Sequence, residues 1–420
     1  MKDIININVS SEIGELEAVI LHRPGNEVEN MTPKNAERAL YSDILNLSVA
    51  HEEYSQLEKI LKKFSTTFQV TDLLKDIVAE ENVKKNIIQK LCSNENICHL
   101  NDYLMTLDKD EFARQIIEGV PLKKETLTGY LSNERYSMQP LHNFFYTRDA
   151  SVTINNKVLI SNMAKKVRER EALIMEALFA HHPKFNAQTV NLAAYHHSEN
   201  QATFEGGDVL VAREDILLIG NSVRTTSQGI DAIVNTIKEN KGTKHILVQE
   251  LPYTPESFIH LDMVFTFLDK DKCMIFEPLI INSSRFICIH IHIEDGEVIS
   301  IKEEKNLLSA LTDLGMDLEP ISCGGRSDLY VQEREQWHSG ANFFALAPGK
   351  VIGYDRNVHT LNEMNKFGFE ILDATDVISD KVDVHSYEKF VITIKGSELS
   401  RGGGGARCMT MPVARKKVDW

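Results

Sequence analysis

Short apolar runs of strand length alternate with amphipathic runs of helix length along most of this chain, and this alternation constrains the fold more than any other feature. Residues 18–23 and 390–395 are β-rich runs, whereas residues 51–64 and 229–238 repeat apolar side chains every three or four positions. Further strands are expected at 68–70, 157–163, 246–248, 343–347 and 351–354, a hairpin at 209–219, and helices at 167–180, 303–314 and 358–367. Strands that alternate with helices predict an α/β fold.

One block of the chain, residues 73–131, breaks this rhythm. It holds little β signal, and its apolar side chains recur at helical spacing, as in Phe112, Ile116 and Val120. We expect 73–131 to form an inserted helical domain, so that the α/β domain comprises residues 1–72 and 132–420. Neither a low-complexity linker nor a strict internal repeat is visible.

The composition narrows the class of protein. A hydrophobic content of 42% over 420 residues is enough for one large domain or two ordinary ones. The net charge of -15 disfavours nucleic acid as a partner, and no apolar run approaches the roughly 18 residues of a membrane span. The six cysteines are scattered without a C-x-x-C pair, which disfavours a disulfide framework or a structural zinc site. We expect a cytoplasmic globular protein, since no signal peptide is visible.

Four polar segments stand beside strand-like runs and carry the reactive side chains. They are Asn143 to Asp149, Glu205-Gly206-Gly207-Asp208, His260-Leu261-Asp262, and a glycine-rich loop at 402–405 that leads to Cys408. Site residues of open α/β folds collect at strand ends and in the adjoining loops. Each segment alone also has an ordinary explanation: an acidic turn, a core histidine whose hydrogen bonds are satisfied, or an idle thiol.

Two other patterns carry less weight. His290 and His292 alternate on one predicted strand face, as zinc ligands can, but no third ligand is spaced to match them. The glycines at 402–405 resemble part of a phosphate-binding loop, but neither a Lys-Ser/Thr pair nor a helix follows them. The sequence therefore predicts neither a metal site nor a nucleotide site.

Taken together, one cysteine, one histidine and several carboxylates without a metal pattern suit attack on a planar cation. A guanidinium is such a cation, because it stays charged at physiological pH and presents five donors in a fixed fork. Carboxylates bind it through bidentate hydrogen bonds. Breaking its C–N bond requires a nucleophile at the central carbon, an acid for the leaving ammonia and a base for water.

In combination these motifs resemble the bacterial arginine deiminase family of the guanidine-modifying superfamily, and the resemblance runs almost from end to end. The motifs that carry it are Ser11-Glu12-Ile13-Gly14-Glu15-Leu16, Leu21-His22-Arg23-Pro24-Gly25-Asn26-Glu27, Phe145-Tyr146-Thr147-Arg148-Asp149, Phe204-Glu205-Gly206-Gly207-Asp208, Ser222-Val223-Arg224-Thr225, His260-Leu261-Asp262 and Arg407-Cys408-Met409-Thr410-Met411-Pro412. The resemblance implies a fivefold pseudosymmetric α/β propeller with a helical insertion. It also implies hydrolysis of L-arginine to L-citrulline and ammonia without metal or cofactor, in a homo-oligomer.

The resemblance assigns roles residue by residue. Cys408 is the expected nucleophile, which forms a covalent amidino intermediate, and His260 is the expected acid and then base. Glu205, Asp149 and Asp262 are the expected ligands of the guanidinium nitrogens, and Glu205 also assists proton transfer. The remaining expected substrate contacts are Arg168 and Arg224 for the carboxylate, and Asn143, Tyr146 and the carbonyl of Gly402 for the amino-acid end.

The chain departs from the family pattern close to these residues. Gly403 stands where the family usually has an arginine on the loop over the site, and Leu141-His142-Asn143 replaces Met-Pro-Asn. Loss of the loop cation should raise the pKa of Cys408, and loss of the proline frees the backbone before Asn143. Arg170, two residues after Arg168, is a rival for the carboxylate role.

Three hypotheses remain open from the sequence. The first is an arginine deiminase, and the second is a cysteine hydrolase or amidinotransferase that acts on another guanidine compound. The third is a catalytically weak paralogue with a binding or regulatory role. The joint presence of Cys408, His260, Glu205, Asp149 and Asp262 argues against the third hypothesis.

Overall fold

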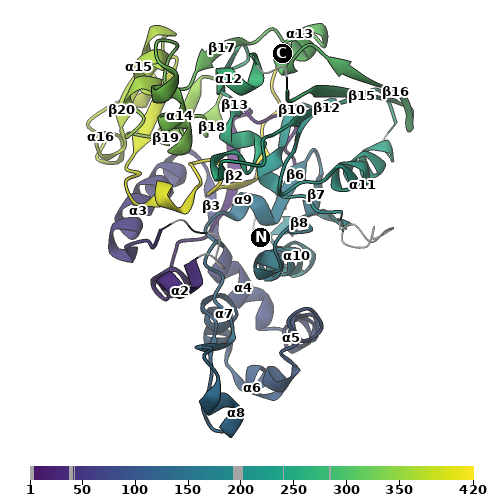
Figure 1. Ribbon diagram of the computed structural model, residues 1–420, viewed down its shortest axis with the longest axis vertical. Coiled ribbons are helices and arrows are strands. Elements are labelled where there is room, and N and C mark those ends of the chain that lie inside the picture. Colours follow the sequence, from purple (N-terminus) through teal and green to yellow (C-terminus); the bar gives the residue numbers. More distant parts are fainter. Residues whose placement is uncertain (1–3, 37–40, 42, 193–201, 240, 283–284) are drawn as a thin grey trace.

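The computed structural model describes residues 4–36, 41, 43–192, 202–239, 241–282 and 285–420, and five sheets of three or more strands form within them (Figure 1). Three sheets have three strands each: β22 (Met411–Arg415), β2 (Leu16–Leu21) and β3 (Thr66–Gln69); β6 (Ser151–Ile154), β7 (Lys157–Ile160) and β9 (Gln188–Asn191); and β13 (Phe265–Phe267), β14 (Lys272–Ile275) and β17 (Glu319–Ser322). The four-stranded sheet has the order β18 (Phe344–Ala347), β19 (Lys350–Tyr354), β21 (Phe390–Ile394) and β20 (Glu370–Asp373). The five-stranded sheet has the order β10 (Val209–Arg213), β11 (Ile216–Asn221), β12 (Lys244–Glu250), β15 (Cys288–Glu294) and β16 (Glu297–Glu304).

The five sheets share one pattern of strand directions. In each, the first two strands are antiparallel and the next strand runs parallel to the second. A parallel neighbour requires a crossover connection. Helices supply these crossovers: α3 (Leu47–Phe64), α10 (Glu169–His181), α11 (Ser227–Lys238), α13 (Leu307–Asp313) and α15 (Val358–Lys366). The structure is therefore mixed α/β, as the sequence predicts.

Local sequence explains why the crossover helices begin where they do. Asn46 precedes α3 and its side chain accepts hydrogen bonds from the backbone N–H groups of Ser48 and Val49. From there, Tyr54, Leu57 and Leu61 recur at helical spacing and are fully buried. The shorter helices of the α/β part are α1 (Asn26–Glu29), α2 (Pro33–Ala36), α9 (Thr147–Ala150), α12 (Glu277–Ile280), α14 (Leu329–Trp337) and α16 (Ala374–Ile378).

The block expected to be helical forms α4 (Val70–Val78), α5 (Glu81–Glu95), α6 (Asn101–Thr106), α7 (Lys109–Glu118) and α8 (Leu127–Leu131), which extend below the sheets in Figure 1. The small sheets are β1 (Ile5–Asn6) with β8 (Phe185–Asn186), and β4 (Val120–Pro121) with β5 (Tyr136–Met138). Buried side chains of the helical block, such as Ile87 and Ile116, join one core with Ile174 of α10. Its separation as a domain stays a prediction, and Val70, expected at the end of a strand, instead begins α4.

The sequence prediction of one helix over 303–314 is wrong in its first residues. Strand β16 continues to Glu304, where it pairs with Cys288 of β15. Helix α13 begins only after Asn306, whose side chain accepts a hydrogen bond of 2.8 Å from the N–H of Ser309. Pairing with a neighbouring strand has overridden the helical pattern, and the cap fixes where the helix starts.

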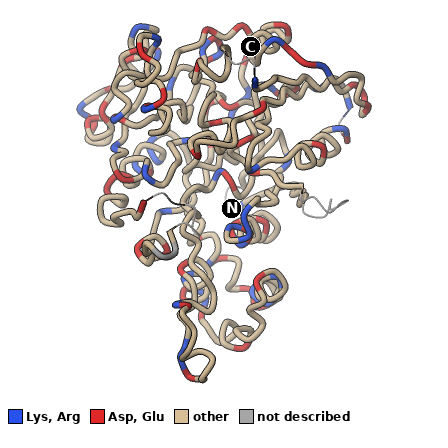
Figure 2. The backbone as a smooth tube through the Cα atoms, in the orientation of Figure 1, with Lys and Arg blue, Asp and Glu red and all other residues tan. Residues whose placement is uncertain are grey.

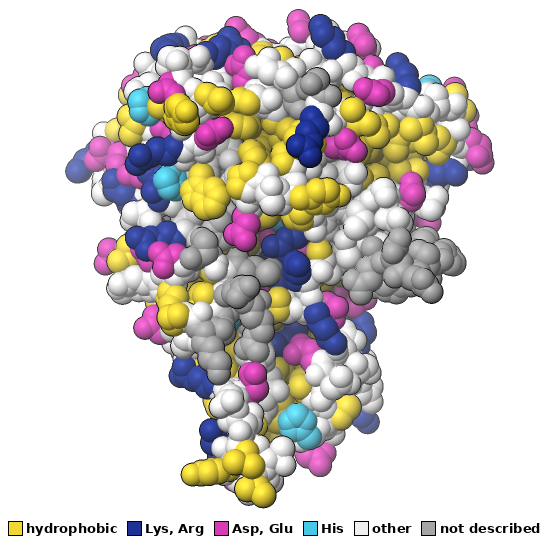
Figure 3. Space-filling view, viewed as in Figure 1, with side chains coloured by type: hydrophobic (Ala, Val, Ile, Leu, Met, Phe, Trp, Pro, Cys, Tyr) yellow, Lys and Arg dark blue, Asp and Glu magenta, His cyan; other side chains and the backbone are white. Residues whose placement is uncertain are grey.

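Charged residues of both signs are interspersed along the chain (Figure 2). Within the described residues, no helix is both long and apolar enough to cross a membrane. The visible face in Figure 3 carries an apolar group at the tip of the helical block, where Leu127, Tyr130 and Leu131 of α8 are each about 70% exposed.

Candidate active site

Four predicted catalytic segments occupy equivalent places in four of the five sheets. Asp149 lies just before β6, Glu205 just before β10, Asp262 just before β13 and Cys408 just before β22. Their side chains are almost entirely withdrawn from solvent, with residue exposures between 0% and 3%. Equivalent positions on separate sheets thus bring together residues that are far apart in the sequence.

Most of the predicted site residues surround a small cavity of about 30 Å³. It is lined by Asn143, Tyr146, Asp149, Arg168, Arg224, Ile259, His260, Gly402, Gly403, Gly404 and Cys408. Glu205 and Asp262 do not line it and lie behind its wall. A larger cavity of about 840 Å³, here called the vestibule, shares Arg224, Ile259, Gly402 and Gly403 with this cavity. These four residues therefore lie between the vestibule and the inner cavity.

The thiol of Cys408 lies among acids and is poorly placed to ionise in the absence of a cation. Its Sγ is 3.8 Å from Oδ2 of Asp262, and that carboxylate also pairs with Arg407 at 2.8 Å. Burial, Asp262 and Asp149 together raise the pKa of the Cys408 thiol well above its ordinary value. A cation that enters between the sulfur and these acids would favour the thiolate.

His260 is held between two carboxylates. Its Nε2 lies 3.0 Å from Glu205 Oε2, and its Nδ1 lies 3.7 Å from Asp149 Oδ1. Burial alone would favour the neutral imidazole, but Asp149 and the Glu205 hydrogen bond outweigh it and raise the pKa of His260 to about 9. Arg224, His260 and Arg168 outweigh burial at Glu205 and lower its pKa to about 2. The pair is therefore an imidazolium beside a carboxylate, which suits a general acid.

Arg168, rather than Arg170, points into the cavity. Its Nη1 is 2.7 Å from Asp149 Oδ2, and its other nitrogens bind Glu171. Arg170 turns the opposite way, toward Glu95 and the backbone carbonyl of Ile116 in the helical block. In this arrangement Arg168 is already paired with an acid that was expected to bind the substrate.

Two buried polar atoms at the cavity lack hydrogen-bond partners among the described residues. One is Oδ1 of Asp149, an acceptor, and the other is Nη1 of Arg224, a donor, which lies 3.6 Å from Glu205. Buried polar groups are normally paired, so unpaired ones at a cavity indicate where a ligand binds. The acceptor matches a guanidinium nitrogen, and the donor matches a carboxylate.

Comparison with known proteins identifies the family of this chain. The model of the arginine deiminase family matches residues 37–415. The arginine deiminase of Listeria monocytogenes serotype 4b (strain CLIP80459) is 32% identical over 429 residues, which cover 98% of each chain. This chain belongs to the arginine deiminase family.

Solved structures show that this family member shares its fold with other enzymes. The amidinotransferase SxtG from Microseira wollei, of the saxitoxin biosynthetic pathway, matches with a TM-score of 0.54 at 13% identity, over 99% of this chain and 98% of its own. Unliganded AgrE matches 96% of this chain with a TM-score of 0.53 at 14% identity, and this chain spans 40% of AgrE. At these identities the likeness shows the fold alone.

The glycine-rich loop of this family member packs directly against the site. A Cβ on Gly402 would lie 2.2 Å from the Tyr146 hydroxyl, and one on Gly404 would lie 2.5 Å from the Tyr146 ring, so neither position accepts a side chain. Gly403 differs: its φ is +85°, yet a Cβ there would meet nothing within 4 Å. His142, the other departure from the family pattern, lines neither cavity and bonds through its ring to the Glu27 carbonyl.

Sequence reasoning missed one residue that touches the nucleophile. Nδ2 of Asn342 lies 3.3 Å from Cys408 Sγ. Asn342 lies just before β18, the first strand of the one sheet that had contributed no predicted residue. A neutral amide carries no catalytic signature by itself, and only its place just before the first strand of a sheet could have indicated it.

A metal centre was not expected, and the charges disfavour one. Among the described residues, only Asp149, Glu205 and His260 bring metal-binding atoms all within 4.8 Å of one another. Both nitrogens of His260 face carboxylates and its pKa is about 9, so the imidazole has no free electron pair at neutral pH. Arg168 occupies the gap between the two acids, 2.7 Å from Asp149 and 3.7 Å from Glu205.

The histidines of β15 gain a third neighbour that the sequence did not indicate. His245 of β12 lies opposite His292, and its Nδ1 is 2.9 Å from Nε2 of His290. His290 also bonds to Glu304 at 3.2 Å. These nitrogens are paired with one another and with an acid, which accounts for the cluster without a ligand.

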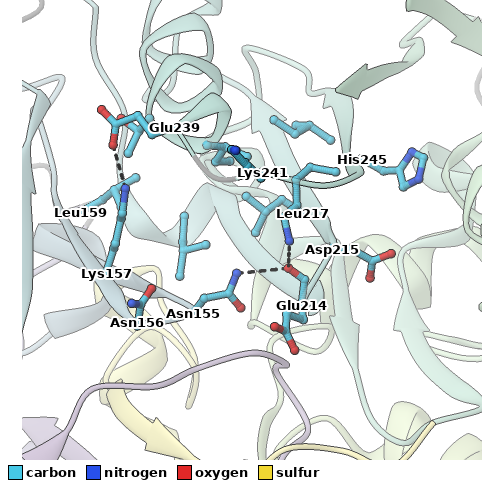
Figure 4. Close-up of a pocket in the computed structure, with 15 residues that line it drawn as sticks. Asn155, Asn156, Lys157, Leu159, Glu214, Asp215, Leu217, Glu239, Lys241 and His245 are labelled. Atoms are coloured by element: carbon cyan, nitrogen blue, oxygen red, sulfur yellow. Dashed lines mark hydrogen bonds and ion pairs between the residues drawn. The ribbon is translucent and has the colours of Figure 1, made fainter. Parts of the chain in front are cut away.

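A third cavity, of about 420 Å³, is lined by His245 but by none of the residues around Cys408 (Figure 4). It is bounded by the β6–β7 and β10–β11 turns and the end of α11, and Lys157 spans part of it to reach Glu239 at 2.8 Å. None of the predicted site residues lines it. Its described lining residues include no cysteine, so size alone does not identify the site.

Replacing His260 by Gln should remove a pH-dependent part of the stability. Because the folded-state pKa is raised from 6.5 to about 9, protonated His260 stabilises the fold fully below pH 6.5, and this contribution is lost as the pH rises through about 9. We expect the difference in free energy of unfolding between wild type and His260→Gln to shrink by up to about 3 kcal/mol across that range. Urea unfolding at several pH values measures it. The exposed His359→Gln serves as control, and parallel profiles for wild type and His260→Gln would contradict the prediction.

Proposed function

We propose that this chain is a cysteine-dependent arginine deiminase that hydrolyses L-arginine to L-citrulline and ammonia. The observation that carries the proposal is the pair of unsatisfied atoms in one buried cavity, the acceptor on Asp149 and the donor on Arg224. An α-amino acid with a guanidinium at its other end satisfies both. The thiol and the imidazolium that the chemistry requires line the same cavity.

The reaction proceeds in two halves. The Cys408 thiolate adds to the central guanidinium carbon, the C–N bond breaks, and His260 gives its proton to the departing ammonia. The product of this half is an amidino group bound through sulfur. Neutral His260 then takes a proton from water, and the hydroxide adds to the same carbon. The carbon–sulfur bond breaks and the new hydroxyl loses its proton to solvent, which gives citrulline and restores the thiolate. Glu205, bonded to His260, keeps the ring oriented in both halves.

Substrate entry requires two changes in the site. The cavity of about 30 Å³ is far smaller than an amino acid, so the loop at 402–404 has to move. Arg168 has to release Asp149, or share it, when the substrate guanidinium arrives, because its Nη1 lies 2.7 Å from that carboxylate. Asp262 keeps Arg407 as its partner and acts on the sulfur and the guanidinium from behind the cavity wall.

A panel assay tests this function. Wild-type protein is incubated with arginine, agmatine, methylated arginines, canavanine and peptidyl arginine, and ureido product is measured by colour. We expect arginine to give the highest kcat/KM. A higher kcat/KM with another compound would favour the second hypothesis, a hydrolase that acts on a different guanidine. The observation that favours this hypothesis is Gly403, which stands where the family has a loop arginine. If no compound gives ureido product, both the first and the second hypothesis are refuted.

Replacing Gly403 by the arginine that the family has at this position tests whether the loop is still adapted to arginine as substrate. We expect Gly403→Arg to keep or raise arginine turnover, by up to about tenfold, because a cation near the thiol lowers the Cys408 pKa. Open space surrounds the position, but its positive φ should cost about 1 kcal/mol of stability. Gly403→Ala carries the same strain without the charge and is the control. A collapse of activity in Gly403→Arg alone would show that the loop is adapted to a different ligand.

Three structural expectations also stay proposals. We interpret the five sheets, with their shared strand pattern, as the blades of a fivefold pseudosymmetric propeller around the site. The second proposal is that residues 1–72 and 132–420 form one domain and residues 73–131 an inserted domain. The third proposal is that the protein forms a homo-oligomer.

A further inference from the structure

We propose that Asn342 is a sixth catalytic residue, whose side-chain amide orients the sulfur of Cys408 and donates a hydrogen bond to its thiolate. The proposal rests on the proposed function, in that it assigns Cys408 as the nucleophile. It adds a role for a residue that is 1% exposed and that no charge or motif had indicated.

The amide of Asn342 has only one orientation that satisfies its neighbours. Nδ2 lies 3.0 Å from the backbone carbonyl of Asp262, and Oδ1 lies 2.9 Å from the backbone N–H of Arg407. Exchanging the two ends would set oxygen against oxygen and N–H against N–H. The nitrogen therefore faces Asp262, and its second hydrogen can reach Cys408 Sγ at 3.3 Å, which is closer than the other sulfur acceptor, Met263 Sδ, at 3.7 Å.

The same amide fixes the position of the nucleophile through the backbone. Arg407 directly precedes Cys408, so the hydrogen bond to its N–H holds the turn that carries the sulfur. A Cβ on Gly405 would lie 2.5 Å from Oδ1 of Asn342, which shows how closely the loop packs on this side chain. Asn342 thus links the loop of Cys408 to the segment of Asp262.

The place of Asn342 in the fold supports a role in the site. Asp149, Glu205, Asp262 and Cys408 each precede the first strand of a sheet, and Asn342 precedes β18 in the same way. With it, every one of the five sheets contributes a polar side chain to the same centre. The fifth sheet supplies the only neutral donor of this group.

A neutral donor suits this position because the charges around the sulfur oppose ionisation. The titratable and charged groups near Sγ are Asp262, Asp149, Arg407, Tyr146 and Tyr354. Of these, Arg407 is already paired with Asp262 and with Glu12. An amide N–H stabilises the thiolate more than the thiol without adding a cation that would repel the substrate guanidinium.

The test is the pKa of the Cys408 thiol in ligand-free protein, measured as the pH dependence of iodoacetamide labelling of the Cys408 peptide by mass spectrometry. We expect Asn342→Ala to raise this pKa by about one unit, a tenfold loss of thiolate at a given pH. Asn342→Asp keeps the shape but places a carboxylate beside the sulfur, so we expect a larger rise. Turnover of arginine should fall about 10- to 100-fold in Asn342→Ala, with KM changed less than about threefold.

Asn357→Ala is the matched control, since Asn357 is also a buried amide that donates to a backbone carbonyl, that of His338, away from the sulfur. Melting curves report any loss of folding in each variant. An unchanged thiol pKa in both Asn342 variants would overturn the proposal. The labelling needs no substrate, so a shifted pKa in a protein that fails to convert arginine would support Asn342 and refute only the proposed function.

Discussion

Replacing Cys408 by Ala should abolish citrulline formation while leaving arginine binding measurable. Among the described residues that line the cavity, Cys408 is the only thiol, and without it the proposed amidino intermediate on sulfur cannot form. We expect kcat to fall on the order of 10⁴-fold or more. A steady-state ureido assay gives the rate, and isothermal titration with arginine gives the affinity. Asp149 and Arg224, which are proposed to contact the two ends of the substrate, remain in this variant, so arginine binding should stay measurable.

Cys98→Ser is the matched control, because this cysteine is exposed and lies in the helical block. Its activity should equal that of wild type. Citrulline production by Cys408→Ala at a substantial fraction of the wild-type rate would refute the covalent mechanism. A covalent adduct trapped on Cys408 during turnover, seen by mass spectrometry of rapidly quenched enzyme, is the positive counterpart.

Replacing Arg224 by Ala should lower kcat/KM for arginine by about 10²- to 10³-fold and leave agmatine within about threefold. Arg224 lines both cavities and its Nη1 has no hydrogen-bond partner among the described residues, so it is placed to bind a carboxylate at the entrance. Agmatine lacks that carboxylate. Rates for both compounds, measured on wild type and variant, give the comparison.

A second role of Arg224 makes this experiment discriminating. Arg224 is the strongest of the cations that lower the pKa of Glu205, and loss of that effect would reach the chemistry of every substrate. Equal losses on arginine and agmatine would therefore show that Arg224 acts through Glu205 and does not bind a carboxylate. Arg401→Ala, which removes a cation from the vestibule but not from the inner cavity, controls for the change in net charge.

The sequence was informative where chemistry requires particular residue types. Cys408, His260, Glu205, Asp149 and Asp262 could be singled out because nucleophiles, acids and bases are few, and the family motifs placed them. The α/β class followed from periodicity. Arg168, just before α10, and Arg170, in its first turn, could not be separated by motif, because only the packing of this segment decides which of them faces the cavity.

Other features depend on contacts between segments that are far apart in the sequence. Nothing local to Arg168 indicates that it pairs with Asp149 in the absence of substrate. Asn342 is an amide in an ordinary loop until β18 is placed among its equivalents. The continuation of β16 to Glu304 is set by β15, and the 303–306 segment read alone resembles the start of a helix.

The pairing of β22 with β2 makes the position of the nucleophile depend on a contact between distant parts of the sequence. Leu16 pairs with Arg415, and Cys408 lies just before β22. Separation of these two strands would displace the sulfur, whereas Asp149, Glu205 and Asp262 precede strands of other sheets. The alignment of the sulfur with the acids therefore requires that β2 and β22 stay docked.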